Sequence, residues 1–299
     1  MKERDRQGCK GLHVVVVPKE DGLGGFSRHW GKHDEAAARW RLWHIMVASC
    51  PLAGATVTVA SSRAQAERMR FGENWWPEGK AHFMGPLVEA ARKGEPIPRL
   101  RASEAAQRYV EGWLHGMDDD VHLVTLTLRN QSTDPARNSD GAAWDSFRKW
   151  LEDAGYSVIV LRDTHEEIAR CPIGPLPALD VDLRLALYER AAMNCIGNNG
   201  PQELLKFSSA PYLVFNLGLE SWREHFRKHF GMEFGDQLPW AGKISAWFTD
   251  RICSTCCARN SHDGSRRLPD GHWPCAGDAA MRPAQGQARA RKAALERGV

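Results

Sequence analysis

An apolar run of eight residues, VHLVTLTL at 121–128, constrains the fold of this chain more than any other stretch. Runs this apolar and β-branched are typical of strands buried on both faces, as in parallel sheets. Arg129 follows the run directly, and Arg137 and Asn138 lie in the polar loop beyond it. Ligands of open α/β sheets bind beyond the carboxyl ends of the strands, and a guanidinium offers a planar fork of donors to an anion. The sequence therefore predicts an anion site here; the alternative is that both arginines pair with surface acids.

The rest of the chain alternates between strand and helix patterns. Apolar runs predict strands over residues 12–17, 55–60, 121–128, 157–161 and 211–215. Helical spacing of apolar residues predicts helices over residues 34–50, 61–70, 103–114, 140–154 and 182–193, with another starting at Pro201. Residues 71–100 are expected to form loop with short pieces of structure, and CIGNNG at 195–200 a tight loop. This order predicts an α/β fold of βαβ units with parallel sheets.

Capping residues mark several of these helices. Ser61 or Ser62, Ser103 and Asp140 suit helix N-caps, and Gly155 suits a helix stop. A glycine at 116 and an acidic run at 118–120 suggest a boundary between two halves. The expected organisation is an N-terminal domain over residues 1–115, a second domain over 116–250 and an irregular or disordered tail over 251–299.

Several stretches carry a resemblance to a known family. They are VTLTLRN…ARNSDGAAWDSFRKWLEDAGYSVIVLRDT, LALYERAAMNCIGNNGPQELLKFSSAPYLVF, FGDQLPWAG and, earlier, CPLAGATVTVASSRAQAE. Together, over about residues 10–242, they resemble bacterial glycosyltransferase-like proteins of surface-polysaccharide biosynthesis loci, which are similar to the two-Rossmann GT-B glycosyltransferases. The resemblance implies two Rossmann-like halves that meet at a cleft. It also implies transfer of a sugar from a nucleotide-sugar donor to a surface glycan or its lipid-linked precursor.

A transferase of this kind must stabilise a leaving diphosphate, and without a required metal that task falls to basic side chains and helix N-termini. Arg129, Arg137 and Asn138 are the candidates after the first apolar run. The amides around Asn198, Asn199 and Gly200 are candidates for a helix terminus, and Asp163 stands where a ribose or base contact would fall. The alternatives are an ordinary turn of Gly and Asn at 197–200, and a cap or salt bridge at Asp163.

The glycine-rich loop GLGGFSRHWGKH at 22–33 would face the acceptor if the resemblance holds. A general base is needed there to deprotonate a sugar hydroxyl, and His29 and His33 are the nearest candidates, with Asp21 behind them. Gly22, Gly24 and Gly25 would shape that acceptor-side loop. The alternative is that these loop histidines have no catalytic role.

The same loop supports a rival enzyme class. Gly22, Gly24 and Ser27 approximate the dinucleotide fingerprint G-x-G-x-x-G, and Arg63 after the second strand suits a 2′-phosphate, as in an NADP-dependent oxidoreductase. The third glycine is absent, and four residues separate the first strand from the first glycine. These departures favour the transferase.

The final stretch, residues 251–299, loses apolar periodicity and becomes rich in Arg, Ala, Gly and Pro. Cys253 and Cys256, followed by His272 and Cys275, have zinc-knuckle spacing. The composition favours a frameshifted or readthrough terminus over a zinc site, so no cofactor is expected. A zinc or basic tail on a degenerate transferase-like domain, with a truncated second half after Gly242, is the non-enzyme alternative: a binding module.

Composition excludes other classes of function. A hydrophobic content of 42%, a charged content of 26% and a net charge of +3 over 299 residues are ordinary for a globular protein and argue against a nucleic-acid coat. No apolar run approaches the roughly 20 residues of a membrane span, and the charged N-terminus lacks the apolar stretch of a signal peptide. A cytoplasmic protein that associates peripherally with the inner membrane surface is expected, with its eight cysteines reduced.

Overall fold

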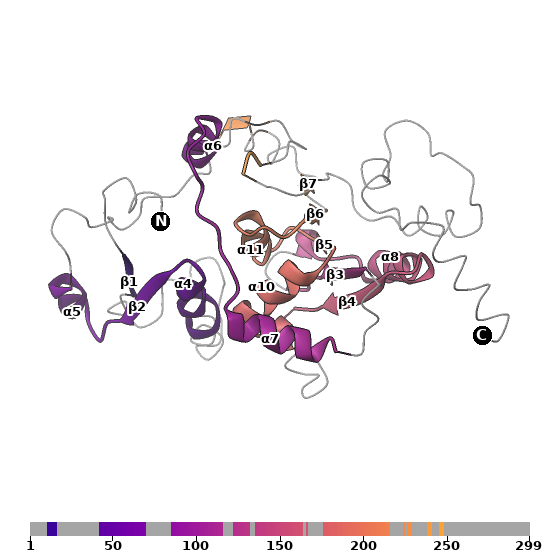
Figure 1. The fold of residues 1–299 in the computed structure, drawn as a ribbon, viewed down its shortest axis with the longest axis horizontal. Coiled ribbons are helices and arrows are strands. Elements are labelled where there is room, and N and C mark those ends of the chain that lie inside the picture. Colours follow the sequence, from indigo (N-terminus) through magenta and orange to yellow (C-terminus); the bar gives the residue numbers. More distant parts are fainter. Residues whose placement is uncertain are drawn as a thin grey trace.

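The fold is α/β with parallel sheets, as predicted (Figure 1). The computed structural model describes residues 11–16, 42–69, 85–115, 122–131, 135–163, 166, 176–215, 224, 227–228, 232, 238–240 and 245–247. Within them lie a two-stranded and a five-stranded sheet, and every strand pair is parallel. No helix of the described residues combines the length and apolarity that crossing a bilayer requires.

The larger sheet has the strand order β4-β3-β5-β6-β7. Its strands are β3 (Leu123–Thr127), β4 (Ser157–Leu161), β5 (Met193–Ile196), β6 (Tyr212–Val214) and β7 (Ser245–Trp247). All five residues of β3 are buried, which confirms the prediction from the apolar run at 121–128. A strand with neighbours on both edges and helices on both faces has no solvent-exposed face, so apolar and β-branched residues occupy every position instead of alternating with charged ones.

Helices cover both faces of this sheet. Helix α8 (Gly141–Asp153) packs on one face, where Trp144 and Phe147 meet Val124 and Leu126. Helices α10 (Val181–Arg190) and α11 (Gln202–Lys206) pack on the opposite face. The chain therefore winds from β3 outward to β4 and then returns past β3 to β5. The order reverses between β3 and β5, which is the position where doubly wound sheets bind ligands.

The smaller sheet pairs β1 (Leu12–Val16) with β2 (Ala55–Val59), in a register that sets Leu12 against Ala55. A π-helical turn, η1 (Leu42–Val47), runs into α4 (Ala48–Leu52) before β2, so the described part of the predicted helix at 34–50 is helical. Helix α5 (Arg63–Arg68) follows β2.

Helix α6 (Gly85–Arg92) was not predicted, because residues 71–100 were expected to be largely loop. The eight residues GPLVEAAR place Val88 and Ala90 in the core, and Pro86 is tolerated in the first turn. The Pro and Gly residues around this segment favoured a loop, and its helical spacing of apolar residues is too short to outweigh them.

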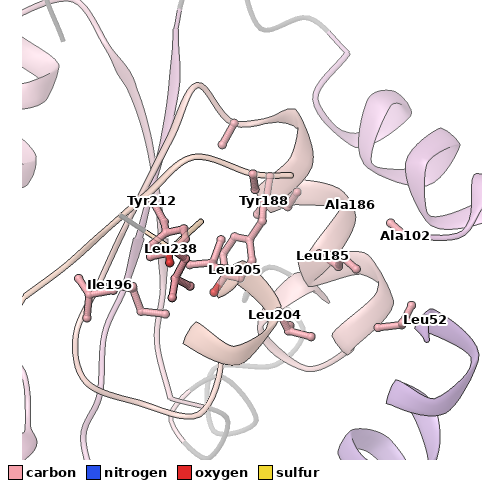
Figure 2. Close-up of a cluster of buried hydrophobic side chains, with 14 of the residues drawn as sticks. Leu52, Ala102, Leu185, Ala186, Tyr188, Ile196, Leu204, Leu205, Tyr212 and Leu238 are labelled. Atoms are coloured by element: carbon pink, nitrogen blue, oxygen red, sulfur yellow. The ribbon is translucent and has the colours of Figure 1, made fainter. Parts of the chain in front are cut away.

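One hydrophobic cluster spans the two predicted domains. Helix α7 (Glu104–Trp113) packs against α10, and Figure 2 shows Leu52 and Ala102 on the side of α10 that carries Leu185. An extended segment at 95–103 leads into α7 and hydrogen-bonds to both sides: Leu100 N donates to Phe207 O (2.6 Å) and Arg101 N to Leu52 O (3.4 Å). The predicted boundary at 115/116 follows α7, and α7 itself belongs to the core around α10.

The predicted caps are confirmed. The hydroxyls of Ser62 and Ser103 accept hydrogen bonds from Gln65 N and Ala106 N, and Asp140 caps α8 through Ala142 N and Ala143 N. Gly155 follows α8 with φ at +90°, in the left-handed region where other residues are strained. These local signals fix where the helices begin and end.

Strand β5 corrects the sequence interpretation, in which a helix continued to residue 193 and a loop began at 195. Helix α10 ends at Arg190, and Met193–Ile196 forms the strand beside β3. Asn194 in its middle is buried and fully bonded: Oδ1 accepts from Thr125 Oγ1 (2.6 Å), and Nδ2 donates to Tyr188 O (3.0 Å) and Pro211 O (2.9 Å). Four residues with a central asparagine carry no local strand signal.

Candidate anion-binding site

Two loops meet at the carboxyl edge of the larger sheet, where the strand order reverses. One follows β3 and contains the short 3-10 helix η2 (Pro135–Arg137); the other is the turn at 197–200 that follows β5. Arg137 Nη2 donates to Asn198 O (2.9 Å) and to Asn198 Oδ1 (3.1 Å). Two residues that the sequence proposed separately, 61 positions apart, are thus in direct contact.

The loop after β3 is closed by two reciprocal pairs of hydrogen bonds. Arg129 N donates to Ser139 Oγ and Ser139 N to Arg129 O, both at 2.9 Å. Gln131 N donates to Asn138 Oδ1 and Asn138 Nδ2 to Gln131 O, also at 2.9 Å. The Asn138 amide, proposed as a donor-binding group, is therefore engaged in shaping the loop. These two pairs of hydrogen bonds hold the backbone at both ends of the segment that carries Arg137.

Asp163, which the sequence proposed as a ribose or base contact, links the end of β4 to the end of β3. Its Oδ2 accepts from Asn130 N (2.8 Å), while Asn130 Nδ2 donates to Glu166 Oε1 (2.7 Å). The carboxylate thus accepts a hydrogen bond from a backbone N–H at the sheet edge, and a contact of Asp163 with a ribose or base stays a prediction. Asp163 thereby stabilises the backbone at Asn130, directly after Arg129.

The turn at 197–200 has backbone N–H groups without an acceptor among the described residues. No described residue accepts a hydrogen bond from the N–H groups of Asn198, Asn199 or Gly200. The turn lies close to the loop after β3, because a Cβ added at Gly197 would stand 3.8 Å from Ser139 Oγ. Consecutive unpaired N–H groups form a concave, partially positive surface that suits an anion.

Two amide side chains in and after this turn are buried without a partner. Asn199 and Gln202 are each 6% exposed, and within the described structure Asn199 Oδ1 and Gln202 Oε1 make no hydrogen bond. Gln202 was not among the residues proposed from sequence. Its only signal there is a polar residue directly after Pro201, in the first turn of the expected helix. An unsatisfied buried oxygen costs stability, so this segment is held at a cost in free energy.

The N-termini of α8 and α10 are already capped by carboxylates. Asp140 caps α8, and Asp180 Oδ1 accepts from Asp182 N (2.8 Å) and Leu183 N (2.9 Å) at the start of α10. Helix α11 has only five residues, so its dipole is small. An anion here would depend on the arginines and on the N–H groups of the turn, and less on helix dipoles than the sequence suggested.

Buried hydrogen bonds connect the elements that carry the site. Tyr188 Oη and Thr127 Oγ1 are 2.8 Å apart, and Arg184 donates to Pro177 O (2.8 Å) and Ala178 O (2.7 Å) in the 3-10 helix η3 (Leu176–Ala178). Burial raises the pKa of Tyr188, so its hydroxyl stays neutral. Burial also raises the pKa of the Cys195 thiol on β5, which excludes that cysteine as a thiolate nucleophile.

Several proposed residues lie outside the described residues. They are the acceptor-side and general-base candidates Asp21, Gly22, Gly24, Gly25, His29 and His33, and the zinc candidates Cys253, Cys256, His272 and Cys275. Arg63, the 2′-phosphate candidate of the oxidoreductase alternative, is the first residue of α5. In the part of the chain that the structure describes, no three His, Cys, Asp or Glu side chains are grouped to hold a metal ion.

No protein-family model and no curated protein matches this chain. Among solved structures, it is similar to E. coli ADP-heptose lipopolysaccharide heptosyltransferase II at 12% identity and a TM-score of 0.34, covering 51% of this chain and 47% of that one. A glycosyl transferase family 9 protein from Veillonella parvula DSM 2008 has 10% identity, a TM-score of 0.38 and coverage of 88% and 71%. The wall teichoic acid polymerase TagF has 11% identity, a TM-score of 0.34 and coverage of 85% and 57%. The chain thus spans about half the length of the heptosyltransferase, and likenesses this distant assign no function.

Proposed function

We propose that this protein is a glycosyltransferase that binds the diphosphate of a nucleotide-sugar donor at the carboxyl edge between β3 and β5. The observation that carries the proposal is the contact of Arg137 with Asn198 at the reversal of strand order. That position is where doubly wound sheets bind nucleotides. The resemblance of residues 10–242 to glycosyltransferase-like proteins of surface-polysaccharide loci supplies the reaction class.

The chemistry of the site suits a growing negative charge. As a glycosidic bond to a diphosphate breaks, charge accumulates on the leaving phosphate oxygens, and fixed donors that need no reorganisation lower the barrier. Arg137 is oriented by Asn198, Arg129 stands at the latched start of the same loop, and the turn contributes N–H groups. These groups perform the electrostatic task without a required metal.

The acceptor half of the reaction remains a prediction from sequence. His29 or His33, with Asp21 behind them, would remove the proton of the attacking hydroxyl, and Gly22, Gly24 and Gly25 would shape the loop around it. A surface glycan or its lipid-linked precursor is the proposed acceptor. A lipid-linked acceptor would bring the protein to the inner membrane surface from the cytoplasm.

Binding of nucleoside diphosphates tests the donor site. UDP, GDP, ADP and CDP are screened by thermal melting, and the best ligand is then titrated by calorimetry. A ligand that binds only the folded protein raises its melting temperature. Arg137→Ala is expected to weaken the best ligand by about tenfold to a hundredfold, because it removes charge-assisted hydrogen bonds.

Arg148→Ala is the matched control. Arg148 lies on α8 with its guanidinium bonded to Asp145 and Glu152, and its loss should leave ligand affinity unchanged. No melting shift with any of the four nucleotides, or equal affinity in Arg137→Ala and wild type, would overturn the proposal. NADP⁺ in the same screen tests the oxidoreductase alternative, and the zinc content of the purified protein tests the binding-module alternative.

A further inference from the structure

We propose that Asn198 is a positioning residue that orients the guanidinium of Arg137 while adding no negative charge to the site; the inference rests on the proposed donor site. Asn198 is 2% exposed, and both its main-chain oxygen and its side-chain oxygen accept from the same nitrogen, Arg137 Nη2. Two acceptors on one nitrogen fix both the position and the plane of the guanidinium.

The other acceptors at this edge show what the neutral amide accomplishes. Asp140, Asp163 and Asp180 place their carboxylates on backbone N–H groups, which carry no net charge. Arg137 Nη2 instead donates to the carbonyl oxygen and the amide oxygen of Asn198. A carboxylate at residue 198 would keep the same hydrogen-bond geometry, since Asp and Asn are nearly isosteric. It would also form an ion pair that competes with an incoming anion.

This contrast separates positioning from a merely structural role. If Asn198 only held the two loops together, Asp would serve as well or better, because a buried hydrogen bond to an arginine gains strength from charge on the acceptor. If Asn198 preserves the positive potential of Arg137, Asp would keep the fold and reduce anion binding. Stability and affinity would then change independently.

The experiment measures binding of inorganic pyrophosphate by calorimetry at low and at moderate salt, together with thermal melting of each variant. Asn198→Asp is expected to melt at or above the wild-type temperature, to bind pyrophosphate about tenfold more weakly, and to show a shallower salt dependence, because screening acts on the charge that it cancels. Asn198→Ala loses one of two acceptors and is expected to bind about threefold more weakly.

Gln131→Glu is the matched charge control. It adds the same charge to the loop that carries Arg137, at a side chain that makes no hydrogen bond among the described residues, and it is expected to change affinity less than about twofold at moderate salt. A drop equal to that of Asn198→Asp would attribute the effect to general charge and overturn the inference.

The remaining outcomes distinguish the two proposals. If wild type binds pyrophosphate and Arg137→Ala does not, but Asn198→Asp binds as wild type does, the positioning role is wrong and the donor site stands. If wild type does not bind pyrophosphate, or Arg137→Ala binds it equally well, the donor site itself is wrong. If Asn198→Asp fails to fold, Asn198→Ala decides: wild-type affinity overturns the inference, and weaker binding at an unchanged melting temperature supports it.

Discussion

Tyr188 and Thr127 join α10 to the last residue of β3 through a hydrogen bond of 2.8 Å between their hydroxyls. Both residues are at most 1% exposed. Thr127 stands two positions before Arg129, so this buried bond fixes the end of the strand from which the arginine-bearing loop departs. The adjoining Thr125–Asn194 bond fastens β3 to β5 in the same layer.

Replacing Tyr188 by Phe should lower the free energy of unfolding by about 1–2 kcal/mol, because Thr127 Oγ1 would lose its partner while remaining buried. Adding Thr127→Val to Tyr188→Phe should recover part of the lost free energy of unfolding, since it removes the hydroxyl left without a partner. Urea denaturation of the single and double variants measures the coupling. Tyr109→Phe, at a tyrosine that is 44% exposed, is the control and should change little. Additive losses in the double variant would contradict the bond.

Removal of the Asp140 cap should destabilise the protein by about 1 kcal/mol. Asp140 Oδ1 accepts from Ala142 N (3.1 Å) and Ala143 N (3.2 Å), and Asp140→Ala leaves both donors at the start of α8 without this acceptor. Asp140→Asn keeps an acceptor and should cost only a few tenths of a kcal/mol. Equal losses in the two variants, measured by urea denaturation, would show that the cap bond is not the cause.

An apolar side chain at residue 202 should stabilise the protein. Gln202 Oε1 is buried without a partner among the described residues, and Gln202→Met nearly conserves volume while removing the unsatisfied oxygen. A rise of about 2–4 °C in melting temperature is expected, corresponding to about 1 kcal/mol. The same change at Gln131, which is only partly buried, should have little effect. A fall in melting temperature of Gln202→Met would indicate that an internal water satisfies the amide.

Glu189→Gln should stabilise the protein more at pH 8 than at pH 4. Burial against α7 raises the pKa of Glu189, in spite of hydrogen bonds from Ala102 N and the Gln107 side chain. A carboxyl group whose folded pKa exceeds its unfolded value favours folding most at pH below the unfolded value, and that contribution is lost as pH rises through the folded pKa. The variant should therefore melt about 1–3 °C above wild type at pH 8 and close to it at pH 4. Equal shifts at both pH values would contradict this account.

Local chemistry made much of the second half predictable. Helix α8 begins after its capping residue Asp140 and is followed by Gly155 with positive φ, and β3 is buried throughout. Strand β5 was missed because the groups that satisfy Asn194 come from distant parts of the chain: Thr125 is 69 residues away, and Pro211 is 17. A short strand of this kind is specified by its neighbours, and its own four residues do not reveal it.

The residues of the candidate site could be proposed from the sequence, but the contacts between them could not. Arg137 could be proposed because its loop follows an apolar run, and Asn198 because its turn precedes a predicted helix. Their contact depends on β3 and β5 being neighbours, which is a property of the topology. Asn138 and Asp163 were proposed by the same logic, and their side chains bind backbone groups of the surrounding loops. Short polar side chains readily bond to nearby backbone, and sequence position alone does not separate that role from ligand contact.

The extended segment at 95–103 limits how the two halves can be exchanged between proteins. Because it bonds to Leu52 on one side and Phe207 on the other, and leads into the helix that covers α10, a chimera joined at 115/116 would part α10 from its native cover. Foreign sequence would have to replace Leu52 and Ala102 against Leu185. A junction placed ahead of Gly85 keeps that segment and α7 with the sheet that they cover, so recombination of the N-terminal and C-terminal parts of the chain is expected to succeed there first.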